Sequence, residues 1–427
     1  MFNPSRFSSI VFVAALLLCA CGRATAFEGP ATADQCAACH AGQKDARLST
    51  PTVAFARQDV HRENGFQCVD CHGGEGTTGD KTRAHDVARG FKGTLSGRAQ
   101  IAACARCHSD GEFMRRFSPR QRVDQVAEYA TSVHGKRLAA GDARVATCAN
   151  CHGAHGIRLV NDAKSPVFPT NVAATCSACH SNSARMTGSK LPNGSPLPTD
   201  QLALYQRSVH YTALTKGNDL SAPTCNDCHG NHGAAPPGAG SVVNVCGTCH
   251  AVFAQRFATS VHAQIFDRGC IECHSNHAVL KPSDEMLGRA PGSLCATCHE
   301  GADDKGAAAA ARMHGDIERL KTGIDRSTAA VARLNNAGME MSAQEIALGT
   351  ARSRLTVTRT EVHAFDPTRV TPEVEEGLKT VAEVDRAADR ATAELRFRRT
   401  GLAVSLGAIL LVVVALVFKI RQIDRRL

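Results

Sequence analysis

The sequence is poor in the bulky aromatic residues that usually fill a protein interior. It has no Trp, three Tyr and an aromatic share of 4% over 427 residues. A chain of this length is long enough for two or more domains, so it still has an interior to fill. Aromatic side chains are therefore excluded as the main filler. A large flat cofactor, repeated many times, is expected instead.

Sequence runs that would indicate β-strands are also scarce. Segments rich in Gly, Pro and Ser, such as residues 189–200 and 233–241, are typical of loops between short elements. We therefore predict a mainly α fold with extensive loops, in which short helices carry the motifs described next.

Cysteine, by contrast, is abundant, and almost all of it lies in one repeated motif. Nine copies of C-x-x-C-H use eighteen of the twenty cysteines, and only Cys19 and Cys21 lie outside them. The motif cysteines are Cys36, Cys39, Cys68, Cys71, Cys104, Cys107, Cys148, Cys151, Cys176, Cys179, Cys225, Cys228, Cys246, Cys249, Cys270, Cys273, Cys295 and Cys298. The histidines that complete the motifs are His40, His72, His108, His152, His180, His229, His250, His274 and His299.

This spacing is the attachment pattern of c-type haem. The two thiols form thioethers with the two vinyl groups of the porphyrin, and the adjacent histidine ligates the iron. Zinc sites also use C-x-x-C pairs, but they do not require His after every second Cys, and disulfides require no His. We therefore predict nine covalently bound c-type haems as cofactors.

Ten histidines remain, and nine irons each have a sixth coordination position to fill. They follow a repeat: an S-V-H or D-V-H precedes a C-x-x-C-H, a further His follows, and another C-x-x-C-H closes the repeat. Four repeats contain eight motifs, and the motif at Cys36 is the ninth. The second histidine of the first repeat is displaced to His85. The expected distal ligands are His61, His85, His134, His155, His210, His232, His262, His277, His314 and His363.

Three of these histidines, His155, His232 and His277, follow a motif by only three residues. The proximal ligand and the thioethers hold that stretch on one face of the porphyrin, whereas a distal ligand comes from the opposite face. We therefore expect each of the three to ligate a neighbouring haem, which brings the haems close together.

Each end of the chain has an apolar run. Arg6, the apolar residues 10–20 and the A-x-A pattern at 24–26 predict an export signal over residues 1–26. Lipidation of Cys21 and an uncleaved anchor are the alternatives. The uncharged run 401–418 predicts a transmembrane helix, bounded at 400–420, with a buried core helix as the alternative. The export signal orients the bulk to the periplasm, with a cytoplasmic tail at 421–427, at the inner membrane.

Between the last motif and this run, the apolar pattern steps by three and four residues, which is helical. It predicts a first helix over about 304–337 that stops at Gly338. A capping box of Ser342 and Glu345 starts a second helix, which ends at 366–367, and a third starts at 371–372. We expect an antiparallel three-helix bundle over residues 301–399, with three separate surface helices as the alternative.

In such a hairpin, His314 and His363 are level at the end nearest the haems, because each is a similar number of residues from the turn. We expect at least one of them, in preference His363, to ligate an iron such as that of the unpaired first haem.

The formal net charge of +9 does not indicate a nucleic-acid partner. Nine oxidised haems, each with two propionates, add about −1 each and bring the total near zero, so no strong positive field is left.

The nine motifs, with the S-V-H and C-H-x-x-H elements, resemble the multihaem cytochromes c, especially the doubled-CxxCH and class III-like families. The resemblance covers residues 36–299 and implies close-packed, bis-His, low-potential haems that conduct electrons in a loop-rich fold. The stretch V-H-A-F-D-P at Val362 is similar to the helical C-terminal regions of pentahaem nitrite reductases and octahaem relatives. Those enzymes keep one open or lysine-ligated haem iron, whereas this sequence has no C-x-x-C-K.

We therefore expect an electron carrier more than a substrate-converting enzyme, with a nonahaem domain at 27–300. Its expected partners are a quinol-oxidising membrane protein and a periplasmic or outer-membrane acceptor. The alternatives are a multihaem reductase of nitrite, hydroxylamine or sulfur oxyanions, and a subunit of a larger respiratory complex.

Overall fold

The computed structural model describes residues 34–238, 241–301 and 303–425, and the chain divides into two compact units, residues 1–168 and 169–427. The described residues are mainly helical, and an isolated bridge between Lys190 and Pro196 is the only strand-type pairing within them. The expected export signal, with Cys19 and Cys21, lies outside the described residues.

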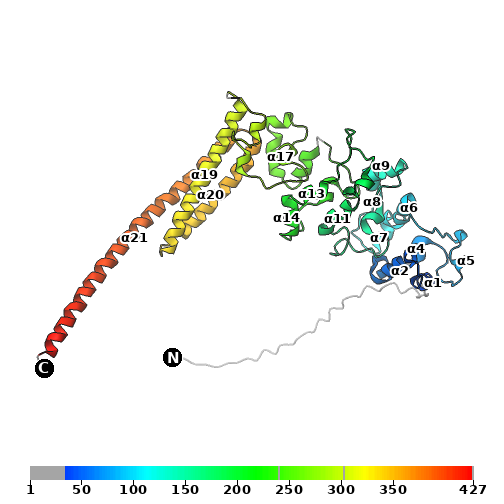
Figure 1. Ribbon diagram of the computed structural model, residues 1–427, viewed down its shortest axis with the longest axis horizontal. Helices are drawn as coiled ribbons and strands as arrows, with labels where there is room; N and C mark the ends of the chain where they lie inside the picture. Colours follow the sequence, from blue (N-terminus) through cyan, green and yellow to red (C-terminus); the bar gives the residue numbers. More distant parts are fainter. Residues whose placement is uncertain (1–33, 239–240, 302, 426–427) are drawn as a thin grey trace, which may run out of the picture. The chain divides into compact units, whose positions relative to one another are not determined.

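Unit 1 consists of short helices joined by turns (Figure 1). They are α1 (Gln35–Ala41), α2 (Ala46–Gln58), α3 (Val60–Glu63), α4 (Cys68–His72), α5 (Lys81–Ala84), η1 (Val87–Arg89), α6 (Gly97–His108), α7 (Gly111–Arg115), α8 (Gln125–Thr131), α9 (Val133–Ala139) and α10 (Cys148–His152).

Unit 2 begins with similar short helices and ends with three long ones. The short helices are α11 (Pro169–His180), α12 (Ser183–Met186), α13 (Gln201–Tyr205), α14 (Val209–Thr215), α15 (Cys225–His229), α16 (Val242–Gly247), α17 (Ala251–Ala258), η3 (Val261–Gln264), α18 (Ile271–His274), η4 (Asp284–Met286) and η5 (Cys295–Thr297). The long helices are α19 (Lys305–Asn336), α20 (Ser342–Glu361) and α21 (Pro367–Asp424), with η6 (Val362–Ala364) between the last two.

The three long helices pack around two apolar clusters. One cluster joins the first half of α19 to the end of α20 and the start of α21, through residues such as Leu320, Leu355 and Val374. The other joins the end of α19 to the start of α20 and the middle of α21, through Leu334, Leu348 and Val384. Therefore α19 and α21 run in the same direction and α20 runs in the opposite one, as Figure 1 shows.

Two starts of these helices differ from the sequence expectation. Ser342 is the first residue of α20 and donates its N–H to the Glu340 carboxylate at 3.0 Å, while Glu345 accepts from Asn335, so the expected capping box does not form. Helix α21 begins at Pro367, because the Asp366 carboxylate accepts the N–H of Thr368 at 2.8 Å and proline suits a first helical position. The end of α19 agrees with expectation, since Gly338 has a φ of +83° just beyond it.

Helix α21 continues past the bundle without interruption (Figure 1). Its apolar run is exposed throughout, with Leu411 at 73% and Phe418 at 69%. This helix is long and apolar enough to cross a membrane. The run therefore fits a single membrane span and not the buried core helix that was the alternative.

Both apolar core clusters of the described residues are centred on the bundle. The short-helix region contains only scattered buried apolar residues, such as Val172, Leu214 and Phe257. The short-helix region therefore has no extended apolar core of its own within the described residues.

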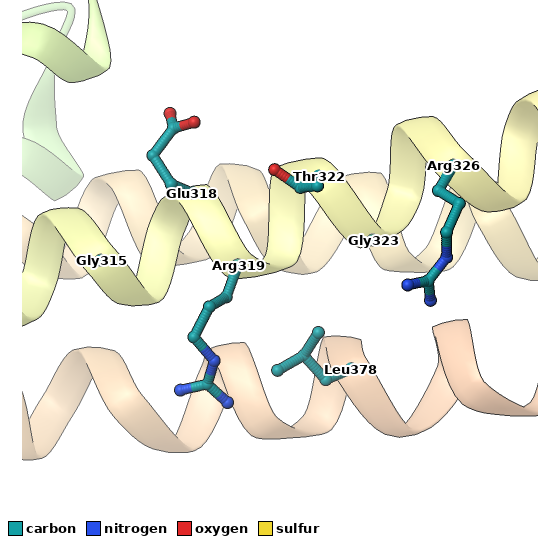
Figure 2. A pocket seen from close by; sticks show the side chains of 7 residues that line it. All are labelled: Gly315, Glu318, Arg319, Thr322, Gly323, Arg326 and Leu378. Atoms are coloured by element: carbon teal, nitrogen blue, oxygen red, sulfur yellow. The ribbon is translucent and has the colours of Figure 1, made fainter.

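A shallow recess of about 500 Å³ lies between α19 and α21 (Figure 2). Its arginines already have partners on the neighbouring helix, since Arg319 donates to Glu375 at 2.8 Å and Arg326 to Asp385. Its lining residues include no His and no Cys. The recess is thus an open groove between two helices that are linked by ion pairs, and it does not resemble a haem or substrate site.

Candidate haem-binding sites

Six of the nine motifs lie wholly inside helices, at Cys36, Cys68, Cys104, Cys148, Cys176 and Cys225. Residues three and four apart are neighbours on a helix face. One helical turn therefore presents both thiols and the histidine ring on the same side. The other three motifs, at Cys246, Cys270 and Cys295, begin or end a helical turn.

The second variable position of the motif has a structural role in three copies. Asp70, Asn150 and Asp227 each accept the backbone N–H of the residue before the first cysteine, at 2.6, 2.8 and 2.8 Å. Each thereby closes a capping box around the start of the motif helix. The sequence signal is an Asp or Asn just before the second Cys.

A left-handed residue follows the motif histidine in four copies. Gly73, Gly153 and Gly230 have φ of +70°, +86° and +79°, and Ser275 takes the same conformation with φ of +64°. Glycine adopts this conformation at little cost, which explains the recurrent C-H-G. In the three copies that form a C-H-x-x-H element, this turn stands between the motif helix and the next histidine.

The first residue of each S-V-H or D-V-H is a buried helix N-cap. Ser132, Ser208 and Ser260 accept backbone N–H groups at 2.8, 3.0 and 3.2 Å, and Asp59 accepts one at 2.9 Å. All four side chains are at most 3% exposed. The cap places the histidine in the first turn of its helix. A short polar residue two positions before a recurrent His is itself a capping signal, so this feature is readable in the sequence beyond its use as a repeat marker.

At seven places in the described part of the chain, two histidine rings lie opposite each other with their centroids 5.9–6.3 Å apart. Every pair joins one motif histidine to one of the ten others. The pairs are His40 with His85, His72 with His155, His108 with His61, His229 with His277, His250 with His210, His274 with His363 and His299 with His262.

This separation fits a metal ion between the two rings. A metal–imidazole nitrogen bond of about 2 Å on each side, plus about 1 Å from each nitrogen to its ring centre, puts the ring centres about 6 Å apart. The residues present therefore fit a bis-histidine haem iron at each of these seven places.

The pairs follow the repeat in a regular way. The histidine of S-V-H or D-V-H faces the closing motif of its own repeat, as His210 faces His250. The histidine of C-H-x-x-H faces the first motif of the preceding repeat, as His277 faces His229. A backbone hydrogen bond joins the segments that carry His210 and His277, because the N–H of Val209 donates to the carbonyl of Val279 at 2.8 Å. In unit 1, Val60 and Ile157 make the same bond at 2.8 Å.

The remaining histidines are placed as follows. His85 faces His40, so the first motif has a partner from its own unit and does not take His363, which faces His274. His314 lies beside Gly288, and no ring pair joins it to a motif histidine within the described residues. Met313 and Val362 share one core cluster, so His314 and His363 lie at the same end of the bundle. The ligand roles of all nineteen histidines stay predictions, those of His134, His152, His180 and His232 included.

Burial and the facing ring lower the pKa of many of these histidines below the usual value of 6.5. Burial is the larger cause and the partner ring the second. The histidines affected in this way are His108, His155, His210, His262, His274 and His277. A lowered pKa keeps the imidazole neutral, which is the form that ligates a metal.

Thiols of consecutive motifs lie next to each other. Hydrogen bonds join Cys104 to Cys148 and Cys246 to Cys270. Cys68 donates to the Asp34 carboxylate at 3.2 Å, beside Cys36, and burial with this carboxylate raises its pKa to about 12. Haems attached to consecutive motifs would therefore have their thioether edges close together.

A protein-family model for the doubled CXXCH motif matches residues 262–304. This segment contains His262 and the motifs at Cys270 and Cys295, and the other seven motifs lie outside it. Comparison with curated proteins and with solved structures finds no match. The matched segment supports similarity to the multihaem c-type cytochromes, and its motifs indicate covalently bound c-type haem.

Proposed function

We propose that this protein is a membrane-anchored periplasmic cytochrome that carries electrons through nine c-type haems during respiration. The observation that carries the proposal is the set of seven facing histidine pairs, each made of one motif histidine and one other histidine. Bound haem would supply one-electron exchange between ferric and ferrous iron.

The pairs favour a carrier over a reductase. An iron with histidine on both faces has no coordination site for nitrite, hydroxylamine or a sulfur oxyanion. Electrons then pass between haem edges, and the side chains act by holding each ring in place and by setting its environment. The adjacent thiols of consecutive motifs, such as Cys176 and Cys225, support short distances between the haems.

The apolar C-terminal helix and the haem region suggest how the protein is positioned relative to the inner membrane. Residues 27–300 are the proposed haem domain, residues 301–399 a helical stalk and residues 400–420 the span at the inner membrane. The span contains no histidine, so it provides no ligand for a haem within the membrane. A separate quinol-oxidising membrane protein is the proposed donor, and a periplasmic or outer-membrane redox protein the proposed acceptor.

The test uses the full chain, matured with its haems and solubilised in detergent. Mass spectrometry and the pyridine haemochrome assay are expected to give nine covalent haems, and electron paramagnetic resonance of the oxidised protein is expected to give low-spin signals only. A high-spin signal of one iron per chain, together with turnover of nitrite or hydroxylamine, would contradict the carrier function and favour the reductase.

One variant tests the ligand pairs directly. His155→Ala removes the ring that faces His72 at 5.9 Å. One iron is expected to become high-spin, and it is expected to be the iron of the Cys68 motif. If the iron of the Cys148 motif opened instead, the pairing between repeats would be wrong.

A further inference from the structure

One of the four buried caps that precede a distal histidine is a carboxylate. Asp59 stands where the other three repeats have Ser132, Ser208 and Ser260. All four make the helix N-cap, so capping alone does not require a charge at this position. The charged side chain must therefore be considered for a second role.

Asp59 is 1% exposed, and three N–H groups converge on its carboxylate. Its Oδ1 accepts the backbone N–H of His61 at 2.9 Å and lies 3.0 Å from the ring Nδ1 of His61. Its Oδ2 accepts the backbone N–H of Ile157 at 2.9 Å. Because Nδ1 of His61 contacts Asp59, the other ring nitrogen of His61 is the one available to ligate an iron between His61 and His108. The two ring centroids are 6.0 Å apart.

The fourth repeat shows the contrast. The Ser260 hydroxyl caps its helix by accepting from Ala263 at 3.2 Å. The Nδ1 of His262 is buried and has no hydrogen-bond partner within the described part of the chain. The equivalent histidines of the first and fourth repeats therefore differ: Nδ1 of His61 contacts a carboxylate, whereas Nδ1 of His262 has no acceptor within the described residues.

A carboxylate on the outer ring nitrogen of a metal-bound histidine makes that histidine a more basic ligand. Reduction of ferric to ferrous haem removes one positive charge from the iron, so a nearby buried carboxylate stabilises the ferric form. The effect is strong at this site because a buried charge is little screened. Hydrogen bonding to the axial ligand is one of the factors by which a protein sets the reduction potential of a haem.

We propose that Asp59 lowers the reduction potential of the haem held by His61 and His108. The inference rests on the proposed function. Asp59 is a positioning residue that acts through His61, since it does not itself reach the iron.

The test compares the full haem-loaded chain with the variants Asp59→Ser and Asp59→Asn. The first gives this repeat the residue that the other three have, and the second removes the charge at nearly constant shape. Each variant is titrated through its reduction with dithionite and redox mediators, and the haems are followed optically and by electron paramagnetic resonance.

One haem is expected to shift, with its ratio of reduced to oxidised iron rising about tenfold at a fixed potential, which is about 59 mV for one electron. Haem count and low-spin coordination are expected to be unchanged. In a His61→Ala background, the haem of His108 has lost its distal ligand, and the shift is expected to disappear.

The reverse substitution is an independent arm and does not depend on how well the Asp59 variants fold. Ser260→Asp offers a carboxylate to the unpaired Nδ1 of His262, and the haem of His299 is expected to become harder to reduce. Absence of a shift in all three variants, or persistence of the Asp59→Asn shift without His61, would overturn the inference while the nine haems remain. A chain without covalent haem would overturn the proposed function itself.

Discussion

Single residues set the local backbone around several of the proposed ligands. The buried caps Ser132, Ser208 and Ser260 begin the helices that carry distal histidines, and the residues after the motif histidines turn the chain at positive φ. The caps place their histidines in the first turn of a helix, and the positive-φ residues turn the chain directly after the motif.

Loss of a cap is expected to be costly at Ser208. Ser208→Ala removes the oxygen that accepts the N–H of Tyr211 at 3.0 Å, and the side chain is 1% exposed. The haem-loaded chain is expected to lose about 1 kcal/mol of stability, the usual cost of removing an N-cap. Thermal unfolding followed by the loss of the low-spin haem spectrum measures it. Ser208→Thr keeps the oxygen and serves as control; equal losses in both variants would argue against capping.

Ser275 is expected to be a strained residue. It has φ of +64° and ψ of 180°, a conformation that strongly favours glycine, whereas Gly230 occupies the equivalent place after the Cys225 motif. Ser275→Gly is expected to stabilise the chain by about 1 kcal/mol, and Gly230→Ser to destabilise it by a similar amount. Thermal unfolding of both variants compares them, and a destabilising Ser275→Gly would show that the Ser side chain has another role.

At the scale of elements, the three long helices build an apolar core that the short-helix region does not have. Gly377 of α21 lies against the Leu320 side chain of α19. A Cβ at Gly377 would lie 2.8 Å from the Leu320 side chain, which is fully buried. The helices pack this closely because glycine occupies that position.

Two matched substitutions test this packing. Gly377→Ala is expected to destabilise the bundle by about 1–2 kcal/mol, because the added methyl group displaces Leu320 in a close-packed core. Gly349→Ala, in α20, meets nothing within 4 Å and is expected to stabilise by about 0.5–1 kcal/mol through helix propensity. Circular dichroism of the detergent-solubilised full chain measures both. Equal effects of the two substitutions would mean that α19 and α21 do not pack closely at Gly377.

At the scale of unit 2, a buried carboxylate is one of the contacts that join the bundle to the last two repeats. Glu361 is 8% exposed and pairs with Arg256 of α17 at 2.6 Å and with Arg369 of α21 at 2.9 Å. This junction holds η6, where the ring of His363 lies 5.0 Å from Phe253 and 6.1 Å from His274. The bundle is thus proposed to contribute a ligand as well as a stalk.

Replacing His363 and replacing His314 are expected to have different effects on the spin state of the haem irons. His363→Ala is expected to convert one of nine low-spin irons to high-spin, because it leaves the iron of His274 without a distal ligand. His314→Ala is expected to leave all nine low-spin, since His314 faces no motif histidine within the described residues. Electron paramagnetic resonance of the oxidised variants counts the high-spin iron. A high-spin signal in His314→Ala would assign that residue as a ligand and would contradict this arrangement.

Much of the fold and of the site follows from local pattern. The helical motifs, the stop at Gly338 and the exposed apolar run of α21 depend on residues close in sequence, so their prediction needs no tertiary information. The expected start of the third long helix at 371–372 is wrong, because two prolines, Pro367 and Pro372, both suit a first helical turn. The cap at Asp366 decides between them.

The sequence by itself determined the chemistry: covalent c-type haem at the C-x-x-C-H motifs, a supply of ten further histidines and a single apolar helix at the C-terminus. It also indicated that His155 and His277 belong to neighbouring motifs, because the thioethers hold each motif to one face of its porphyrin. Which ring meets which was decided only by the tertiary structure. His40 with His85 and His274 with His363 are 45 and 89 residues apart, and such contacts depend on how distant turns and helices pack rather than on any local periodicity.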